Sequence, residues 1–276
     1  MIGVLLGLFV SATSLHAHGL LPRFWHHAYF DGGRGDLFSQ RAIKYCASAI
    51  STRLELMESF SLTQFNGGFR IEGFPDAVRF IKLDHPQAQR IADLALHLRD
   101  LIFDRECLES INTLVAGQDV IREALWRSAV IHLMKCFGTS ASRFQLSADK
   151  IFKTEPPEAK KVFEYFQHLR DKHLAHDENS YSTCIPGAVV NRGDAPSKIA
   201  KIITFGAHTM TLDQTSFANL MLLIKRAHDW VISQYDLACD RMVERLEAVP
   251  YSQLTSMEEV VYSVPTVDEI GRSRPR

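Results

Sequence analysis

The chain has 276 residues, of which 46% are hydrophobic and 23% are charged, a composition that is typical of globular proteins and excludes a disordered chain. This length is sufficient for one large domain or two small ones. The formal net charge of −1 excludes a whole-molecule field that attracts nucleic acid, so any RNA binding requires a local basic cluster.

Residues 1–35 are predicted to be irregular or to result from a misplaced start codon. The apolar run Ile2–Val10 and the residues after it resemble a signal peptide, but no Lys or Arg precedes the run. About nine apolar residues are too few to span a bilayer, which needs roughly 20. We therefore expect a cytoplasmic protein without a membrane span. Four histidines here lack partners at metal-ligand spacing, so we expect no metal site. They are His16, His18, His26 and His27.

Residues 36–84 are predicted to form an N-terminal helical extension with a short hairpin. Apolar residues between Leu37 and Glu58 recur at steps of three and four, which predicts an amphipathic helix. The sequence Phe65-Asn-Gly-Gly-Phe69 then predicts a tight turn between two short strands.

Residues 85–248 are predicted to form the main helical domain. A first helix is expected to start near Asp84, because Pro86 is suited to a first helical turn. A second is expected from a cap at Asp119 to Phe137. A third opens at the double proline 156–157 and is expected to end near His176.

A change of periodicity follows the third helix. The short β-like runs Ile185–Asn191 and Lys198–His208 flank the turn-forming residues 192–196, which predicts a hairpin. A long helix is then expected from Asp213 to about Ala248, and residues 249–276 are expected to form a flexible tail.

The segment with the most specific chemistry is Leu169-Arg-Asp-Lys-His-Leu-Ala-His-Asp-Glu-Asn179, at the end of the third helix. An arginine and a histidine separated by four to six residues also occur elsewhere in the chain, so the spacing alone is weak evidence. What distinguishes residues 170–176 is context: a polar Asp171 follows the arginine and a small Ala175 precedes the histidine. The other matches are Arg79 to His85, Arg90 to His97, and Arg127 to His132.

This segment resembles the motif helix of HEPN proteins of the abortive-infection and toxin type. The preceding predicted helix, Trp126–Gly138, is similar to the second helix of such domains, and the resemblance covers roughly residues 85–248. It implies a mainly α fold: a HEPN-like helical bundle, here with a β-hairpin inserted after the motif helix. HEPN domains usually form dimers in which paired motif helices build one composite site.

The resemblance further implies a metal-independent endoribonuclease without a cofactor, acting in phage defence or as a toxin. His176 would move protons during attack of a ribose 2′-hydroxyl on the adjacent phosphate, and Arg170 would hold that phosphate. Asp171 would orient the arginine or the substrate, while Lys172 and His173 would add positive charge that binds RNA. The implied partners are an RNA substrate, a second copy of the chain and a cognate antitoxin. Imidazole and guanidinium suit these roles, since one titrates near neutrality and the other stays charged.

Three readings of this segment stay open at this point. The first is the nuclease, although residues six apart in a regular helix point about 120° away from each other. The second is a non-catalytic HEPN-like module that binds RNA, a nucleotide or a partner protein. The third is an exported helical protein with a coincidental motif, in which Arg170 and Asp177 share a surface network and His176 interacts with the helix dipole.

Overall fold

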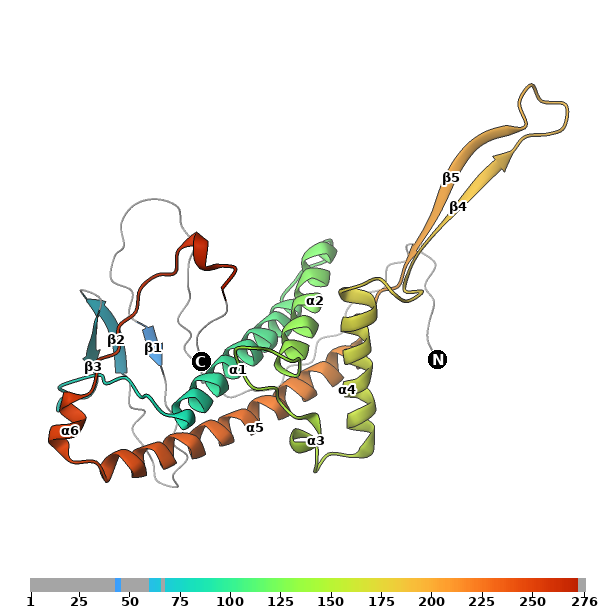
Figure 1. Cartoon of the computed structure of the whole chain (residues 1–276). Coiled ribbons are helices and arrows are strands. Elements are labelled where there is room, and N and C mark those ends of the chain that lie inside the picture. Colours follow the sequence, from blue (N-terminus) through green and yellow to red (C-terminus); the bar gives the residue numbers. More distant parts are fainter. Residues whose placement is uncertain (1–42, 46–59, 66–67, 273–276) are drawn as a thin grey trace. The chain divides into compact units, whose positions relative to one another are not determined.

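The computed structural model describes residues 43–45, 60–65 and 68–272 (Figure 1). The chain forms two compact units, which divide after Asp84 and after Glu244. The first unit contains residues up to 84 together with 245–272, and the second contains residues 85–244. The predicted signal-like run, the four N-terminal histidines and most of the predicted helix at 37–58 lie outside the described residues.

The first unit contains a small antiparallel sheet with the strand order β1-β2-β3. Its strands are β1 (Ile43–Tyr45), β2 (Phe60–Phe65) and β3 (Gly68–Glu72). The pairing of β2 with β3 around residues 66–67 confirms the predicted hairpin. The predicted helix at 37–58 is wrong at residues 43–45, which pair with residues 60–62 as a strand. Helical periodicity is a weak signal that tertiary pairing overrides, and Ile and Tyr both favour strands.

Two short elements lie in the segment that was expected to be a flexible tail. Helix α6 (Tyr251–Ser256) and the 3₁₀ turn η2 (Val267–Glu269) belong to the first unit. Residues 257–260 pack along residues 79–82, where Arg79 pairs with Glu259 at 3.0 Å and Ile81 forms a β-bridge with Glu259. This strand-like contact gives the segment a fixed partner inside the unit.

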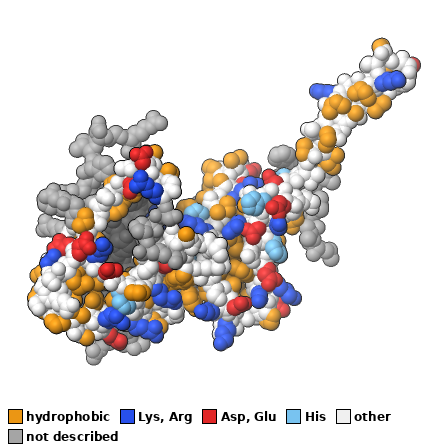
Figure 2. Space-filling model, viewed as in Figure 1, with side chains coloured by type: hydrophobic (Ala, Val, Ile, Leu, Met, Phe, Trp, Pro, Cys, Tyr) orange, Lys and Arg blue, Asp and Glu red, His pale blue; other side chains and the backbone are white. Residues whose placement is uncertain are grey.

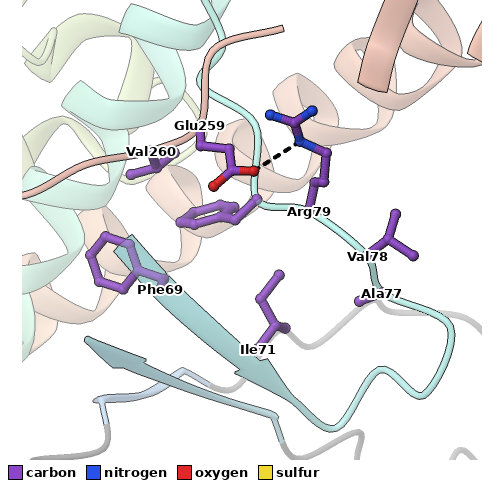
Figure 3. Close-up of a pocket in the computed structure, with 8 residues that line it drawn as sticks. Phe69, Ile71, Ala77, Val78, Arg79, Glu259 and Val260 are labelled. Atoms are coloured by element: carbon purple, nitrogen blue, oxygen red, sulfur yellow. Dashed lines mark ion pairs between the residues drawn. The ribbon is translucent and has the colours of Figure 1, made fainter. Parts of the chain in front are cut away.

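A cavity of about 230 Å³ lies between β3 and this C-terminal segment (Figure 3). Phe69 and Ile71 from β3 and Phe80 provide apolar walls, and the Arg79–Glu259 ion pair lies beside them. The charges of Arg79 and Glu259 cancel each other, so the ion pair gives the cavity no net charge.

The second unit contains most of the helices in the described part of the chain. They are α1 (Pro86–Ile111), α2 (Asp119–Cys136), α3 (Ala148–Ile151), α4 (Pro157–Leu169), the π-helical turn η1 (Arg170–Leu174) and α5 (Gln214–Glu247), which extends three residues into the first unit. The mainly helical fold with a hairpin between helices is confirmed. None of the described helices is long and apolar enough to cross a membrane.

Helix starts follow from local capping chemistry. His85 caps α1, because its Nδ1 accepts a hydrogen bond from the backbone N–H of Gln87 at 3.0 Å. Asp213 caps α5 by accepting hydrogen bonds from the N–H groups of residues 215 and 216. The predicted cap at Asp119 is wrong by one position: Gln118 precedes the helix, and Asp119 pairs with Arg122 within the first turn.

The core of the second unit lies where α1, α2, α4 and α5 pack together. Trp126 is fully buried against Phe166, and its indole N–H donates to the Thr211 hydroxyl at 2.9 Å. Phe137 packs against Phe163. The predicted role of Trp126 as a core residue is confirmed, and these contacts fix α4 and η1 against α2.

Strands β4 (Ser182–Val190) and β5 (Ile199–His208) form the hairpin between η1 and α5. The predicted runs 185–191 and 198–208 are confirmed within one to three residues. The hairpin extends away from the helices (Figure 1). Every residue of β5 is exposed.

Candidate functional site

The motif segment is not a continuation of a regular α-helix. Helix α4 ends at Leu169, and residues 170–174 form a π-helical turn in which the N–H of Ala175 donates to the carbonyl of Arg170 at 2.9 Å. The chain then leaves the helix through Asp177, whose φ of 47° lies in the left-handed region. The predicted end of this helix near His176 is confirmed within two residues, but its last turn is π-helical and not α-helical.

Arg170 forms one ion pair and lies beside Gly138. Its guanidinium pairs with the adjacent Asp171 carboxylate, and both side chains are about one-third exposed. Its Nη2 also lies 3.5 Å from the position that a Cβ on Gly138 would occupy, just past the end of α2. A cation at this place interacts favourably with the carbonyl end of the helix dipole. The expectation that Asp171 orients Arg170 agrees with this contact, whereas Arg170 and Asp177 form no ion pair among the described residues.

A second guanidinium group, that of Arg143, contacts the last turn of α2. The carbonyl oxygen of Lys135 lies 3.7 Å from the same Cβ position on Gly138. Arg143 donates from its Nη2 to that carbonyl at 3.2 Å. The guanidinium groups of Arg143 and Arg170 therefore both approach the C-terminal turn of α2, one from the loop after the helix and one from η1.

Lys172 and His173 were expected to add positive charge that binds the substrate, but one is ion-paired and the other is buried. Lys172 forms an ion pair with Glu178, and this pairing raises the pKa of the lysine and lowers that of the glutamate. His173 is buried, with 3% of its surface exposed. The positive charge of Lys172 is thus neutralised by Glu178, and the side chain of His173 lies inside the protein.

His173 belongs to a polar cluster at the base of the hairpin. Its ring packs against Tyr181 and against His208 of β5, at centroid distances of 5.4 and 5.2 Å. His208 accepts from or donates to Ser182 at 3.0 Å and contacts Arg127 at 3.1 Å. Burial, followed by the nearby His208 and Arg127, lowers the pKa of His173. A neutral His173 therefore joins the motif turn to the hairpin.

His176 is exposed on the turn that follows η1. Among the described residues no hydrogen bond or ion pair holds its side chain, and its charge helps to lower the pKa of Glu178 after the larger effect of Lys172. The side chain is accessible to a substrate, and no contact in the described structure joins it to Arg170.

Sequence reasoning missed a row of buried polar residues on one face of α1. Asp93, His97, Asp100 and Asp104 are each 8% exposed or less, although an apolar stripe was expected along this helix. Their spacing of four, three and four residues places them on one helical face. That spacing is visible in the sequence, so a search for polar residues at helical intervals would have found the row.

Asp100 is the centre of the charged part of this row. Its Oδ2 accepts from Arg143 at 2.6 Å, and its Oδ1 accepts from Lys135 at 3.0 Å and lies 3.4 Å from His132 Nδ1. Burial acts to raise the pKa of Asp100, but the hydrogen bonds from Lys135 and Arg143 outweigh it and lower the pKa. His132, the histidine of the competing match that starts at Arg127, therefore lies beside a carboxylate where α1 and α2 pack together.

The other members of the row are neutral or satisfy backbone groups. His97 Nε2 lies 2.9 Å from the carbonyl of Phe144, and burial lowers its pKa to about 4, so Nε2 carries the proton in a neutral ring. Asp104 is fully buried, and neither carboxyl oxygen has a hydrogen-bond partner. Burial, reinforced by the charge of Asp100, raises the pKa of Asp104 to about 9, so this side chain is protonated at neutral pH.

No group of three or more His, Cys, Asp or Glu side chains in the described segments is arranged to hold a metal ion. No protein-family model, curated protein or solved structure matches the chain.

Proposed function

We propose that the protein is a metal-independent endoribonuclease of the HEPN type, in which Arg170 and His176 act on RNA at a site shared by two copies of the chain. The observation that carries this proposal is the coincidence of the motif with a π-helical turn and a left-handed residue, Asp177. A π-helical turn is frequently found at functional sites, whereas a left-handed residue is common where a helix ends, so the π-turn is the informative part of this coincidence.

The chemistry assigns different tasks to the two residues. Arg170 is charged at all physiological pH values and presents a partly exposed fork to a phosphate, while Asp171 limits its motion. His176 is exposed and has no competing hydrogen bond, so its imidazole is free to accept the proton of a ribose 2′-hydroxyl. Attack of that oxygen on the adjacent phosphorus releases the 5′-oxygen, which takes up a proton and leaves a 2′,3′-cyclic phosphate.

Lys135 and Arg143 lie in the last turn of α2 and in the loop after it, and both side chains pair with Asp100. Asp100 offsets part of their charge, and Arg143 is almost fully buried. We therefore assign Arg143 to the positioning of the loop after α2, and His173 to the positioning of η1. Lys172 remains a predicted substrate contact that first has to leave Glu178. A role in phage defence, or as a toxin with a cognate antitoxin, is part of the same proposal.

A non-catalytic module of the same fold is the second candidate. It is favoured by the compensated Lys172 and the buried His173, which leave few free cations beside the motif. In this alternative, the segment 170–176 binds RNA, a nucleotide or a partner protein without turnover.

The test is cleavage of a broad RNA pool by the full chain in excess EDTA. The wild-type protein is compared with Arg170→Ala and His176→Ala. Two variants serve as matched controls: His168→Ala removes a histidine that is exposed like His176, and Arg122→Ala removes an arginine that is partly buried and paired with an aspartate, like Arg170. We expect the wild type and both controls to produce cyclic phosphate ends. His176→Ala should lose about 100-fold or more in rate, the usual contribution of a proton-transfer group.

The other outcomes discriminate between the candidates. Equal cleavage by all five proteins would remove the motif from the chemistry. Absence of cleavage in every sample, together with RNA or nucleotide binding that Arg170→Ala weakens, would favour the non-catalytic module.

A further inference from the structure

The hairpin meets the motif turn at a cluster of two histidines and an arginine. Figure 2 shows apolar side chains along the hairpin, and charged and histidine side chains near the place where it joins the helices. His173 of η1 lies 5.2 Å from His208, the last residue of β5, measured between ring centroids. Arg127 of α2 reaches His208 at 3.1 Å. Three segments that are far apart in the sequence therefore meet at one point.

The hydrogen bonds of His208 determine which of its ring nitrogens carries the proton. A guanidinium group only donates hydrogen bonds, so the contact with Arg127 Nη2 makes Nε2 of His208 an acceptor. In a neutral ring the other nitrogen is then protonated, and Nδ1 donates to the Ser182 hydroxyl at 3.0 Å. A charged ring has N–H groups at both nitrogens, so its Nε2 could not accept from Arg127. The arrangement is therefore suited to a neutral His208.

His173 is also suited to the neutral form. It is 3% exposed, and neither of its ring nitrogens has a hydrogen-bond partner. Burial, followed by the nearby His208 and Arg127, lowers its pKa. Because a buried charge without a partner is strongly unfavourable, protonation of this ring favours its departure from the site.

The acidic groups near the cluster only partly oppose this effect. Glu123 of α2 pairs with Arg127 at 2.6 Å, and Asp177 follows η1. Both carboxylates act to raise the pKa of His173, but burial and the neighbouring histidine and arginine outweigh them. Tyr181, which precedes β4, adds an aromatic contact at a centroid distance of 5.4 Å. The balance of these surroundings favours the uncharged cluster.

We propose that His173 and His208 form a pH-sensitive joint, which holds the motif turn at the base of the hairpin at neutral pH and releases it in acid. The closed joint binds fewer protons than the open one, so its stability falls as the pH drops below about 6.5, the ordinary pKa of histidine. The turn held in this way contains Arg170 and leads to His176. The inference concerns the regulation of the candidate site, and only its consequence for RNA cleavage rests on the proposed function.

Amide hydrogen exchange of the full chain, read by mass spectrometry, measures the opening of residues 170–181 without RNA. Rates at about pH 7.5 and about pH 5.5 are corrected for the intrinsic pH dependence of amide exchange. Each histidine that gains a proton on opening reduces the protection by up to about tenfold between these values. We expect this loss in the motif turn of the wild type, and unchanged protection in the buried part of α2.

Two charge variants on α2 should shift the opening in opposite directions, which a purely structural role would not produce. Arg127→Gln removes the cation beside His208 and keeps an amide donor, so the opening should move to lower pH. Glu123→Gln removes a carboxylate that favours a charged ring, so the opening should move to higher pH. Glu158→Gln is the matched control, because it neutralises an exposed carboxylate in the first turn of α4, and it should leave the opening unchanged.

A double variant removes both titrating rings. His173→Phe keeps an aromatic ring, and His208→Gln keeps an acceptor for Arg127, so together they should hold the turn closed at both pH values. Protection of the wild type that does not change with pH overturns the proposal, and so does a pH-dependent loss that persists in the double variant. If circular dichroism shows that the double variant is unfolded, the two α2 variants decide, and shifts in the same direction overturn the proposal.

RNA cleavage is measured separately over the same pH values. If the proposed nuclease is correct, the double variant should retain more of its activity at about pH 5.5 than the wild type does. A protein that cuts no RNA but opens its motif turn in acid would refute the nuclease and leave the joint in place.

Discussion

Replacement of Asp104 by leucine should stabilise the protein, and the gain should increase with pH. Asp104 is fully buried on α1, and neither of its oxygens has a hydrogen-bond partner. Leucine has a similar branched shape and no polar atoms, so it retains the packing and removes the cost of burying a carboxyl group.

The size of the effect follows from the raised pKa of Asp104. The unfolded chain loses the proton of an aspartic acid near pH 3.9, whereas the folded chain keeps it up to a pKa of about 9. Between these values the folded state binds one more proton than the unfolded state, so stability falls as pH rises. The slope is up to about 1.4 kcal/mol per pH unit, which amounts to at most about 4 kcal/mol at pH 7.

The assay is urea unfolding of the wild type, Asp104→Leu and Asp104→Asn at several pH values between 5 and 9. The difference in free energy of unfolding between Asp104→Leu and the wild type should grow steadily over this range. Asp104→Asn should abolish the same pH dependence while retaining a buried polar group. A difference that stays constant with pH, or a leucine variant that is less stable than the wild type at pH 8, would refute the reasoning.

Two further predictions concern the same buried row. Arg143→Leu should lower the free energy of unfolding by about 3 kcal/mol, because it leaves Asp100 without its buried partner, and Asp100→Leu in the same chain should restore most of the loss. Urea unfolding of the single and double variants measures this, and a double variant as unstable as Arg143→Leu alone would contradict it. Because burial lowers the pKa of His97 to about 4, the folded state resists protonation, so stability should fall as pH drops from about 6.5 toward 4. His97→Gln should lose less stability than the wild type between pH 7 and pH 5, and a larger loss would count against the neutral ring.

The sequence by itself determined the helical character of the second unit and the position of the hairpin. These features depend on local signals, namely the double proline before α4, the Asp213 cap and the change to β-like runs after the motif. Local chemistry of this kind acts within a few residues, so it can be recognised without knowledge of distant contacts. The same reasoning failed at residues 43–45, where pairing with β2 outweighed a helical pattern.

The tertiary structure alone decided the surroundings of the candidate site. Sequence context and a resemblance to a known family singled out Arg170 and His176, but they did not indicate the π-helical turn, the position of Arg170 beside Gly138, or the burial of His173. The polar row on α1 could have been recognised in the sequence from its helical spacing. Its burial, however, depends on packing against α2 and the loop around Arg143. Long-range packing sets which groups lose water and which keep it, and that loss determines their pKa values and their availability to a substrate.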